Sequence, residues 1–415
     1  MLDQSYSENN LRRLLHPADF VRYPLTNDDA WIKAKLLSTS NKVSAETINY
    51  NTFDFISKRK FDFYKCNDFD TDIVLRKLDN NIKRLYKIKQ TDRTEIVKQV
   101  KTVLSDATPI NIVRLDIKSF YENISKNKVL KKINNDYLLS SESKFILDKI
   151  FNNKFFKDKD GLPRGIGVSA TLSEMYLRNI DKYIKRSSGV IYYARYVDDI
   201  LIVSCNDGQK LIEEVEKKLT ELGLELNTKK CDNLQLPAKG KALCNCVSSC
   251  VCNEGFEYLG YKFSFPLTKR NKQNKRFVSI TVANSKISKI KTRLVNSFLD
   301  YSLTKNICLL DMRLKYLSGN YFIPLTKSGE NLKGGIFYHY PLITDDNCLK
   351  DLTKFLRKLI FSRHGNLGAK ISPSLTHHLR KYLLRYTFEG GFKKRIIHKL
   401  TPREIGEIKE CWRYE

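Results

Sequence analysis

The chain has 415 residues, 41% of them hydrophobic, which is enough for two or three compact units with cores and excludes a disordered tail. Lys and Arg number 74 against 46 Asp and Glu, and a net charge of +28 repels itself unless a polyanion is the working partner. Nucleic acid is the polyanion that this balance favours, with a merely Lys-rich and Asn-rich composition as the alternative.

Export and membrane insertion are not expected. No stretch approaches the ~18 apolar residues that a membrane-spanning helix needs, and the polar first ten residues lack the apolar core of a signal peptide. Ten cysteines in a chain of this length do not suggest a disulfide framework. We therefore expect a cytoplasmic protein with no membrane partner.

The first 104 residues carry mainly helical signals. Leu11 to Leu15 and Trp31 to Leu37 indicate short helical pieces, and no role follows for residues 1–60. From Asp70 to Leu104, apolar residues recur every three or four positions with basic residues between them. A solvated helix face and a basic finger that grips phosphates both explain this pattern.

The next segments combine a strand, a loop and a helix. Ile110 to Ile117 predicts a strand that reaches Asp116, and a carboxylate there suits either a metal ligand or the cap of a following helix. Residues 126–154 are helical and basic. Gly161 to Ser169 is a Gly-rich and Pro-rich loop before an apolar helix, Ala170 to Ile184. Such a loop either lets the backbone approach a ligand or is a plain connection.

The central feature is an adjacent pair of carboxylates between two apolar runs. Ile191 to Ser204 predicts a tight β-hairpin with Asp198 and Asp199 at its tip. Two like charges side by side are unfavourable unless a cation or water relieves them, and Mg²⁺ suits because it prefers carboxylate oxygens and shares its shell with substrate phosphates. A polar turn is the alternative. Asp116 lies 82 residues before Asp198 (198 − 116), so it can join them only if the two strands are neighbours.

Helices and extended pieces alternate after this hairpin. Gln209 to Leu222 predicts an amphipathic helix ended by Gly223, and Leu224 to Leu226 a short strand. Phe256 to Phe263 alternates like a second hairpin. Lys269 to Arg276 is a basic connector of the kind that contacts backbone phosphates. The remaining predictions are extended structure over Asn320 to Tyr340 and helices over Ser285 to Leu303, Cys348 to Phe361 and Ser374 to Tyr386.

Four thiols precede the second hairpin: Cys244, Cys246, Cys250 and Cys252. They suit a tetrahedral zinc site, although ligands spaced this closely strain the chelate. The alternative is a small cysteine-rich hairpin whose reduced thiols pack as minor hydrophobic groups. Both interpretations stay open.

These pieces follow the order of the motifs of reverse transcriptases, across residues 85–265. Arg114 to Tyr121 resembles their first palm motif, Gly161 to Ser169 their second, and Tyr196 to Asp199 their Tyr-x-Asp-Asp box. Leu226 to Lys230 resembles the fourth motif and Phe256 to Tyr261 the primer-grip hairpin. The chain is most similar to prokaryotic enzymes of the defence-associated, abortive-infection and unknown-group type. Its opening residues resemble the first enzyme of the paired type 3 defence systems.

The resemblance implies an α+β, right-hand polymerase fold with fingers, a palm built on an antiparallel sheet with the Tyr-Val-Asp-Asp hairpin, and a helical thumb. The implied segments are an N-terminal extension, fingers, palm with a finger insertion around 125–160, thumb with connector, and a helical basic C-terminal extension. Their bounds are 1–69, 70–109, 110–265, 266–345 and 346–415.

The implied activity is RNA-templated DNA synthesis, in which a nucleotidyltransferase extends a 3′-hydroxyl with deoxynucleotides. Positioning and charge stabilisation carry this chemistry, with two Mg²⁺ ions about 3.5–4 Å apart. The implied partners are deoxynucleoside triphosphates, a DNA product, an RNA template (a dedicated non-coding RNA in anti-phage defence), and a second copy of the chain or a second defence protein. An RNA-binding maturase-like or scaffold protein, and a polymerase without a conventional template, remain alternatives.

The resemblance also assigns roles to single residues. Asp116, Asp198 and Asp199 are the implied catalytic carboxylates and, with the Ile117 carbonyl, the metal ligands. Lys230 is the implied catalytic proton donor or counter-charge for the pyrophosphate; a solvated lysine is the alternative.

The nucleotide and primer contacts follow in the same way. Tyr121 is the implied steric gate against a ribose 2′-hydroxyl, with an ordinary buried tyrosine as the alternative. Arg164 stands where the second motif commonly has Gln, and it adds a charge beside the implied templating base. The other implied nucleotide contacts are Arg93, Lys98 and Gly165, and the implied primer grip is Phe256, Tyr258, Leu259 and Gly260.

Overall fold

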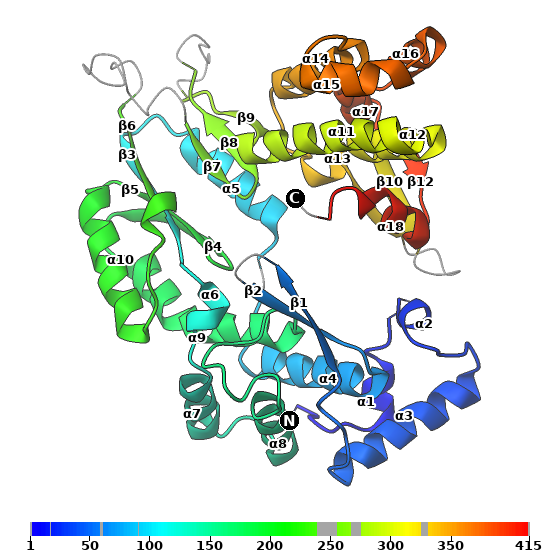
Figure 1. The fold of residues 1–415 in the computed structure, drawn as a ribbon. Coiled ribbons are helices and arrows are strands. Elements are labelled where there is room, and N and C mark those ends of the chain that lie inside the picture. Colours follow the sequence, from blue (N-terminus) through cyan, green and yellow to red (C-terminus); the bar gives the residue numbers. More distant parts are fainter. Residues whose placement is uncertain are drawn as a thin grey trace. The chain divides into compact units, whose positions relative to one another are not determined.

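A computed structural model gives the chain a mixed helix and sheet structure, as predicted (Figure 1). The structure describes residues 2–413 apart from 17, 59–60, 90, 239–254, 267–274 and 325–330. Two compact units make up the chain: the first is Met1–Ile96 with Thr108–Lys241, and the second is Val97–Ala107 with Ala242–Glu415. This division cuts across the predicted palm segment, 110–265, because its last strands belong to the second unit.

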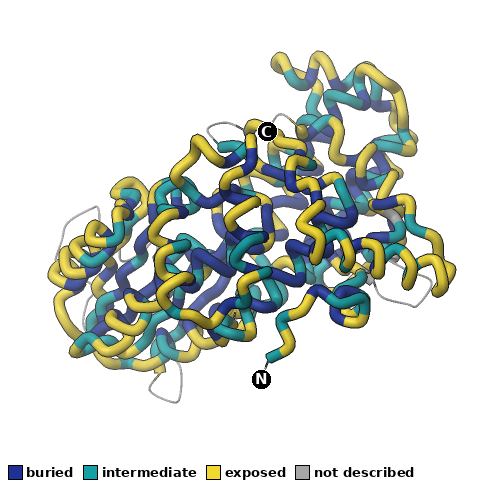
Figure 2. The backbone as a smooth tube through the Cα atoms, turned by 90° about the horizontal axis from the view of Figure 1, so that it is seen from below, coloured by how far each residue is buried: buried dark blue, intermediate teal, exposed yellow. Residues whose placement is uncertain are grey.

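Helices of the first unit contribute most of its hydrophobic core. Buried and exposed residues alternate along the backbone of the chain (Figure 2). The helix α5 (Arg93–Leu104) begins in this unit and ends in the second. The other helices are α1 (Glu8–Arg12), α2 (Asp19–Arg22), α3 (Asp29–Ser44), α4 (Phe69–Leu85), α6 (Phe120–Asn123), α7 (Lys126–Asp136), α8 (Ser141–Phe151), α9 (Gly167–Arg186), α10 (Gly208–Leu222) and the 3-10 helix η1 (Thr228–Lys230).

Two antiparallel sheets belong to the first unit. The hairpin of β1 (Phe53–Lys58) and β2 (Phe61–Cys66) forms a separate two-stranded sheet. The larger sheet has the order β4-β5-β3-β6 (Figure 1), and helix α9 contacts β4 while α10 contacts β3 and β6. Its strands are β3 (Ile110–Asp116), β4 (Val190–Tyr196), β5 (Asp199–Ser204) and β6 (Asp232–Leu236).

Sequence and structure agree on most elements of this unit but differ at several places, among them strand β6, which was not predicted. The long helical signal from Asp70 is divided into α4 and α5, because the chain leaves the helix after Tyr86 and Lys87 has a φ of 50°. The β1–β2 hairpin was not predicted. The predicted strand Leu224 to Leu226 is wrong, since only a single bridge joins Leu226 to Ile117.

The second unit has its own hydrophobic core under a bundle of helices. One sheet has the order β7-β8-β9, and another has the order β11-β10-β12, in which β10 and β12 are parallel. The elements are β7 (Phe256–Tyr258), β8 (Tyr261–Ser264), β9 (Ser279–Val282), α11 (Asn284–Thr304), α12 (Ile307–Ser318), β10 (Asn320–Pro324), β11 (Asn331–Gly335), α13 (Ile336–His339), α14 (Asn347–Phe361), α15 (Gly365–Ile371), η3 (Ser372–Ser374), α16 (His377–Leu383), α17 (Phe388–Lys393), β12 (Ile397–Lys399) and α18 (Pro402–Glu410).

The predicted second hairpin is confirmed as β7 and β8. Its two-residue turn has positive φ at both Leu259 (49°) and Gly260 (77°), the geometry that matches the twist of the flanking strands. The extended stretch predicted from Asn320 ends at Gly335, where helix α13 begins. None of the helices in the described ranges combines the length and the apolar character that a bilayer span requires.

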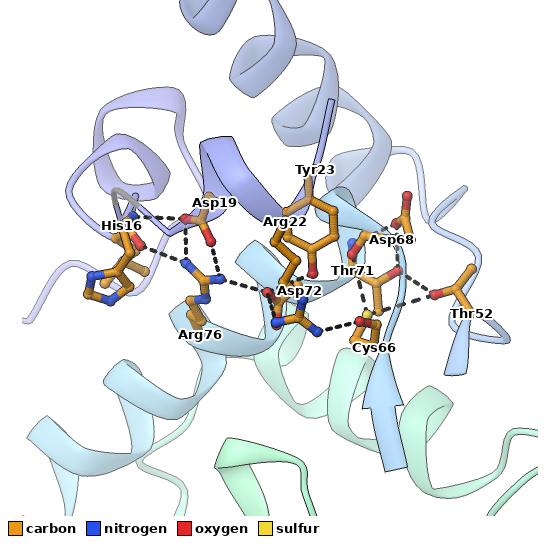
Figure 3. Close-up of polar contacts among 11 residues, drawn as sticks. His16, Asp19, Arg22, Tyr23, Thr52, Cys66, Asp68, Thr71, Asp72 and Arg76 are labelled. Atoms are coloured by element: carbon orange, nitrogen blue, oxygen red, sulfur yellow. Dashed lines mark hydrogen bonds and ion pairs between the residues drawn. The ribbon is translucent and has the colours of Figure 1, made fainter. Parts of the chain in front are cut away.

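A buried polar network ties the N-terminal residues to helix α4 (Figure 3). Arg76 donates to both carboxylate oxygens of Asp19, at 2.6 and 2.7 Å, and to Asp72 at 2.6 Å. Tyr23 donates to Asp72 at 2.9 Å, and Arg22 donates to the Cys66 carbonyl at 2.5 Å. Asp19 is only 2% exposed, and although burial acts to raise its pKa, the bonds from Arg76 and the His16 backbone hold that pKa below the usual value.

We predict that Arg76→Ala lowers the free energy of unfolding of the first unit by about 3 kcal/mol, because the Asp19 carboxylate then stays buried without its cation. Lys218→Ala, which removes one end of an exposed pair with Glu221, is the control and should leave the free energy of unfolding almost unchanged. Urea denaturation at pH 7 measures both. Because the pKa of Asp19 is depressed in the fold, this stabilisation is present above the unfolded value of 3.8 and is lost as the pH falls through the folded value.

Candidate active site

The strands that carry the predicted carboxylates are neighbours. Strands β3 and β5 pair antiparallel with Asp116 opposite Asp199, and the backbone N–H of Ile117 donates to the Asp198 carbonyl at 3.1 Å. Strand β4 pairs on the other side of β5, with Tyr196 opposite Asp199. The sheet therefore brings together residues 82 positions apart (198 − 116), the condition on which the sequence interpretation depended.

Asp116 is buried, and both of its carboxylate oxygens accept hydrogen bonds. Its side chain accepts from Lys230 at 2.9 and 3.1 Å and from the Asn227 amide at 3.0 Å. The Asn227 backbone also donates to the Asp116 carbonyl at 2.7 Å. Asp116 is 4% exposed, whereas the Lys230 side chain is 56% exposed. The lysine therefore approaches a buried carboxylate from the solvent side.

A second cation lies on the same sheet. Arg114 precedes Asp116 by two residues, so both side chains leave the strand on one face. Its guanidinium lies 3.3 Å from Asp199 and 3.4 Å from Asp232 on β6. Lys230 and Arg114 thus each neutralise one carboxylate of the cluster.

Burial shapes the acidity of the hairpin carboxylates. Desolvation is the main reason that the pKa of Asp198 is raised, and the charges of Asp199 and Asp116 raise it further against the opposing effect of Lys230. Desolvation likewise raises the pKa of Asp199, with Arg114 acting in the opposite direction. A cation between these groups would relieve both the burial and the repulsion.

The hairpin tip is held in a strained shape. Val197, the first residue of the turn, has a φ of 61°, which is unfavourable for a β-branched residue. Arg195 donates to the Val197 carbonyl at 3.0 Å and is itself fixed by ion pairs to Glu174 (2.6 Å) and Asp181 (2.8 Å). Because both carboxylates come from helix α9, that helix orients the tip.

The donor set suits a hard divalent cation, since three carboxylates share one end of the sheet and two of them carry an electrostatic penalty. As the side chains stand, no three His, Cys, Asp or Glu groups in the described ranges are gathered closely enough to hold a metal ion. In the same arrangement, Lys230 forms an ion pair with Asp116 and Arg114 forms one with Asp199.

The predicted nucleotide contacts Tyr121, Arg164 and Gly165 lie together in the first unit. Arg164 donates to both oxygens of Glu122, at 2.6 and 3.0 Å, and its Cζ atom lies 5.1 Å from the centre of the Tyr121 ring. Gly165 has a φ of 93°, and a Cβ there would lie 2.2 Å from the Tyr64 carbonyl oxygen. Burial is the main cause of the raised pKa of Tyr121, and Asp198 contributes to it.

Other predicted site residues lie elsewhere. Arg93 begins helix α5 in the first unit, while Lys98 is exposed on the part of that helix assigned to the second. The predicted primer grip is on β7 and its turn, also in the second unit, where Glu257 accepts from the Asn284 backbone at 2.6 Å. The predicted zinc ligands Cys244, Cys246, Cys250 and Cys252 fall outside the described residues.

Sequence reasoning missed several residues of the site. Arg114 had a signal, since it precedes Asp116 by two positions on the same face of a strand. Asn227 lies inside the fourth motif but received no role. Arg195 and Glu122 are adjacent to motif residues, yet their partners are 14 to 42 positions away, which local spacing does not reveal.

The comparisons with known proteins agree with this site. Residues 63–263 match the family model of reverse transcriptases, described as RNA-dependent DNA polymerases. This part of the chain, just under half of its length, is therefore similar to a reverse transcriptase domain. The mixed helix and sheet architecture is that of a right-hand polymerase, as predicted.

Two solved structures of telomerase from Candida tropicalis are similar to the chain. The apo form, truncated from the C-terminal domain, has 14% identity and a TM-score of 0.35 over 58% of this chain and 48% of that one. The complex with the TWJ fragment of telomeric RNA has 14% identity and a TM-score of 0.36 over 91% and 67%. The chain thus spans about half the length of the first telomerase chain. No curated protein sequence matches.

We predict that Asp198→Asn stabilises the metal-free protein at pH 7.5, by an amount of the order of 1 kcal/mol, because it removes a buried charge that its neighbours repel. Since the pKa of Asp198 is raised in the fold, the penalty is present above that folded value and disappears as the pH falls toward the unfolded value of 3.8. Thermal unfolding in EDTA at pH 7.5 and pH 4 measures the difference.

Asp54→Asn, on the exposed face of β1, is the matched control and should change the midpoint at neither pH. An Asp198→Asn protein that is less stable than the wild type at pH 7.5 would contradict the electrostatic account of the hairpin tip.

Proposed function

We propose that this protein is a reverse transcriptase that extends a 3′-hydroxyl with deoxynucleotides on an RNA template. The single observation that supports this most directly is the pairing of β3 with β5, which puts Asp116 opposite Asp199 inside a reverse transcriptase domain. The net charge of +28 suits a nucleic-acid substrate.

Phosphoryl transfer asks the protein mainly for positioning and charge. The primer oxygen forms a bond to the α-phosphorus, the bond from that phosphorus to the bridging oxygen breaks, and pyrophosphate leaves as the hydroxyl loses its proton. Lys230 would turn from Asp116 toward the leaving group as a counter-charge or proton donor. The backbone at Gly165, which carries no side chain, would lie against the nucleotide.

Asp116, Asp198 and Asp199 would hold Mg²⁺. When bound, Mg²⁺ would stabilise the charge on the attacking and leaving oxygens. Support for this assignment comes from the chemistry of the donors. All three are carboxylates, Asp116 is buried and the other two are half-buried, and the pKa values of Asp198 and Asp199 are raised by desolvation and by neighbouring charge.

The template and the biological role are further parts of the proposal. We infer a dedicated non-coding RNA as template and anti-phage defence as the role, both on the resemblance to defence-associated enzymes. Sequencing the nucleic acid that co-purifies with the protein tests it: one abundant short RNA with complementary DNA supports the proposal, and a random mixture contradicts it.

We predict that Asp198→Asn lowers RNA-templated incorporation of deoxynucleotides by at least about 100-fold, because a metal ligand is worth several kcal/mol of charge stabilisation. Primer extension on a defined RNA template in Mg²⁺ measures the effect. The Asp54→Asn variant should keep wild-type activity.

RNA binding separates this proposal from a scaffold function that has only the fold. Asp198→Asn should bind the template RNA as tightly as the wild-type protein in a filter-binding assay. A wild-type protein that binds RNA and incorporates no nucleotide would favour the scaffold, and persistent synthesis by an Asp198→Ala, Asp199→Ala protein would refute the assignment.

We predict that Tyr121→Ala raises the efficiency of ribonucleotide incorporation by roughly tenfold or more relative to deoxynucleotides, because it removes the ring that would exclude the 2′-hydroxyl. Single-nucleotide insertion with dATP and ATP gives the ratio of kcat/KM values. An unchanged ratio in a protein that still inserts dATP would show that Tyr121 is an ordinary half-buried tyrosine.

A further inference from the structure

Glu122 makes the most specific polar contact beside the predicted nucleotide site. Its two carboxylate oxygens accept from the Nε and Nη2 atoms of Arg164 at 2.6 and 3.0 Å. This two-pronged pairing is the strongest and most directional form of ion pair between side chains. The Arg164 side chain is 19% exposed and that of Glu122 is 37% exposed, so solvent only partly screens the contact.

The backbone on both sides of this pair is closely packed. The Leu162 N–H donates to the Tyr121 carbonyl at 2.7 Å, and a Cβ at Gly161 would lie 2.3 Å from the Glu122 carbonyl oxygen. The Arg164 carbonyl accepts from Tyr64 at 2.8 Å. These backbone contacts fix the loop on both sides. The backbone positions from which the Glu122 and Arg164 side chains extend are therefore well defined.

Two aromatic rings complete the setting of the guanidinium. Its carbon lies 4.3 Å from the centre of the Phe61 ring and 5.1 Å from that of Tyr121. Tyr121 in turn packs edge-on against Phe120, with ring centres 5.1 Å apart. A planar guanidinium stacks well on such rings, so the position of Arg164 and the position of the Tyr121 ring depend on each other.

Asp198 is the competing partner for this cation. Burial acts to lower the pKa of Arg164, and its pairing with Glu122 raises that pKa, with Asp198 also contributing to the increase. Arg164 therefore lies within electrostatic reach of the hairpin tip. Without Glu122, the charge of Asp198, which the proposed chemistry needs, remains as a source of compensation for the partly buried guanidinium.

We propose that Glu122 is a positioning residue for the nucleotide site. Its carboxylate holds the Arg164 guanidinium between two aromatic rings and away from Asp198. The pair then acts as one unit of zero net charge at a place where reverse transcriptases commonly have an uncharged Gln. This role rests on the proposed polymerase function, since it concerns where the nucleotide and the hairpin carboxylates meet.

The test compares Glu122→Gln with the double variant Glu122→Gln, Arg164→Gln. The single variant leaves Arg164 without its counter-charge, so kcat/KM for dATP insertion should fall roughly tenfold, a typical coupling for residues in contact. The double variant removes the freed cation and should recover most of that loss. A double variant that stays as poor as the single one would contradict a harmful role for the freed cation.

The preference for deoxynucleotides over ribonucleotides is a second measurement, and a general loss of stability would not change it. The ratio of dATP to ATP insertion should fall in Glu122→Gln, because the Tyr121 ring loses its fixed neighbour, and should change little when Tyr121→Ala is already present. Lys218→Gln, which breaks the exposed pair on α10, is the matched control and should leave the activity and the ratio unchanged.

A stability cycle needs no catalytic activity and separates the two levels of the proposal. Glu122→Gln and Arg164→Gln should be strongly non-additive in urea denaturation. Additive effects there would overturn the pairing, and a double variant no more active than the single one would overturn the positioning role. A wild-type protein without polymerase activity would instead refute the proposed function itself, and the positioning role with it.

Discussion

The structure of the first unit depends on keeping negative charge buried at one end of a sheet. The pairing of β3 with β5 brings Asp116 beside the Asp198–Asp199 tip. Like charges under desolvation are costly, and the raised pKa values of Asp198 and Asp199 express that cost. Lys230 and Arg114 offset part of it, each by an ion pair to one carboxylate. The proposed chemistry would use the uncompensated part of this charge to hold a further cation.

The surroundings of the cluster keep it from relaxing. Three constraints act on the tip: strand pairing on both sides of β5, the Arg195 side chain under the turn, and the unfavourable φ of Val197. Arg195 is itself held by two carboxylates of α9, so the apolar helix after the Gly-rich loop orients the hairpin. Strain of this kind persists only where neighbouring structure over-determines it.

Local patterns in the sequence predicted what local forces decide. The Ile191 to Ser204 hairpin followed from two apolar runs around a pair of carboxylates, and the helix ended by Gly223 followed from its amphipathic pattern and its terminal glycine. The β1–β2 hairpin was missed because its apolar side chains do not mark one buried face: Phe55 and Ile56 are neighbours that point to opposite faces of β1, and each is 58% exposed. The docking of residues 1–60 was equally hidden, since it depends on ion pairs such as Asp19 with Arg76, 57 positions apart.

Arg164 shows the same limit at the site itself. Taken from the sequence, it adds a positive charge where an uncharged side chain is common, and it suggests altered handling of the substrate. The structure pairs it with Glu122, 42 positions away, so the added charge is matched within the fold. The effect of a charged motif residue on the electric field at the substrate depends on whether a partner neutralises that charge. For this protein the partner is a carboxylate that follows directly after the proposed gate, so the departure from the motif and its compensation are one structural feature.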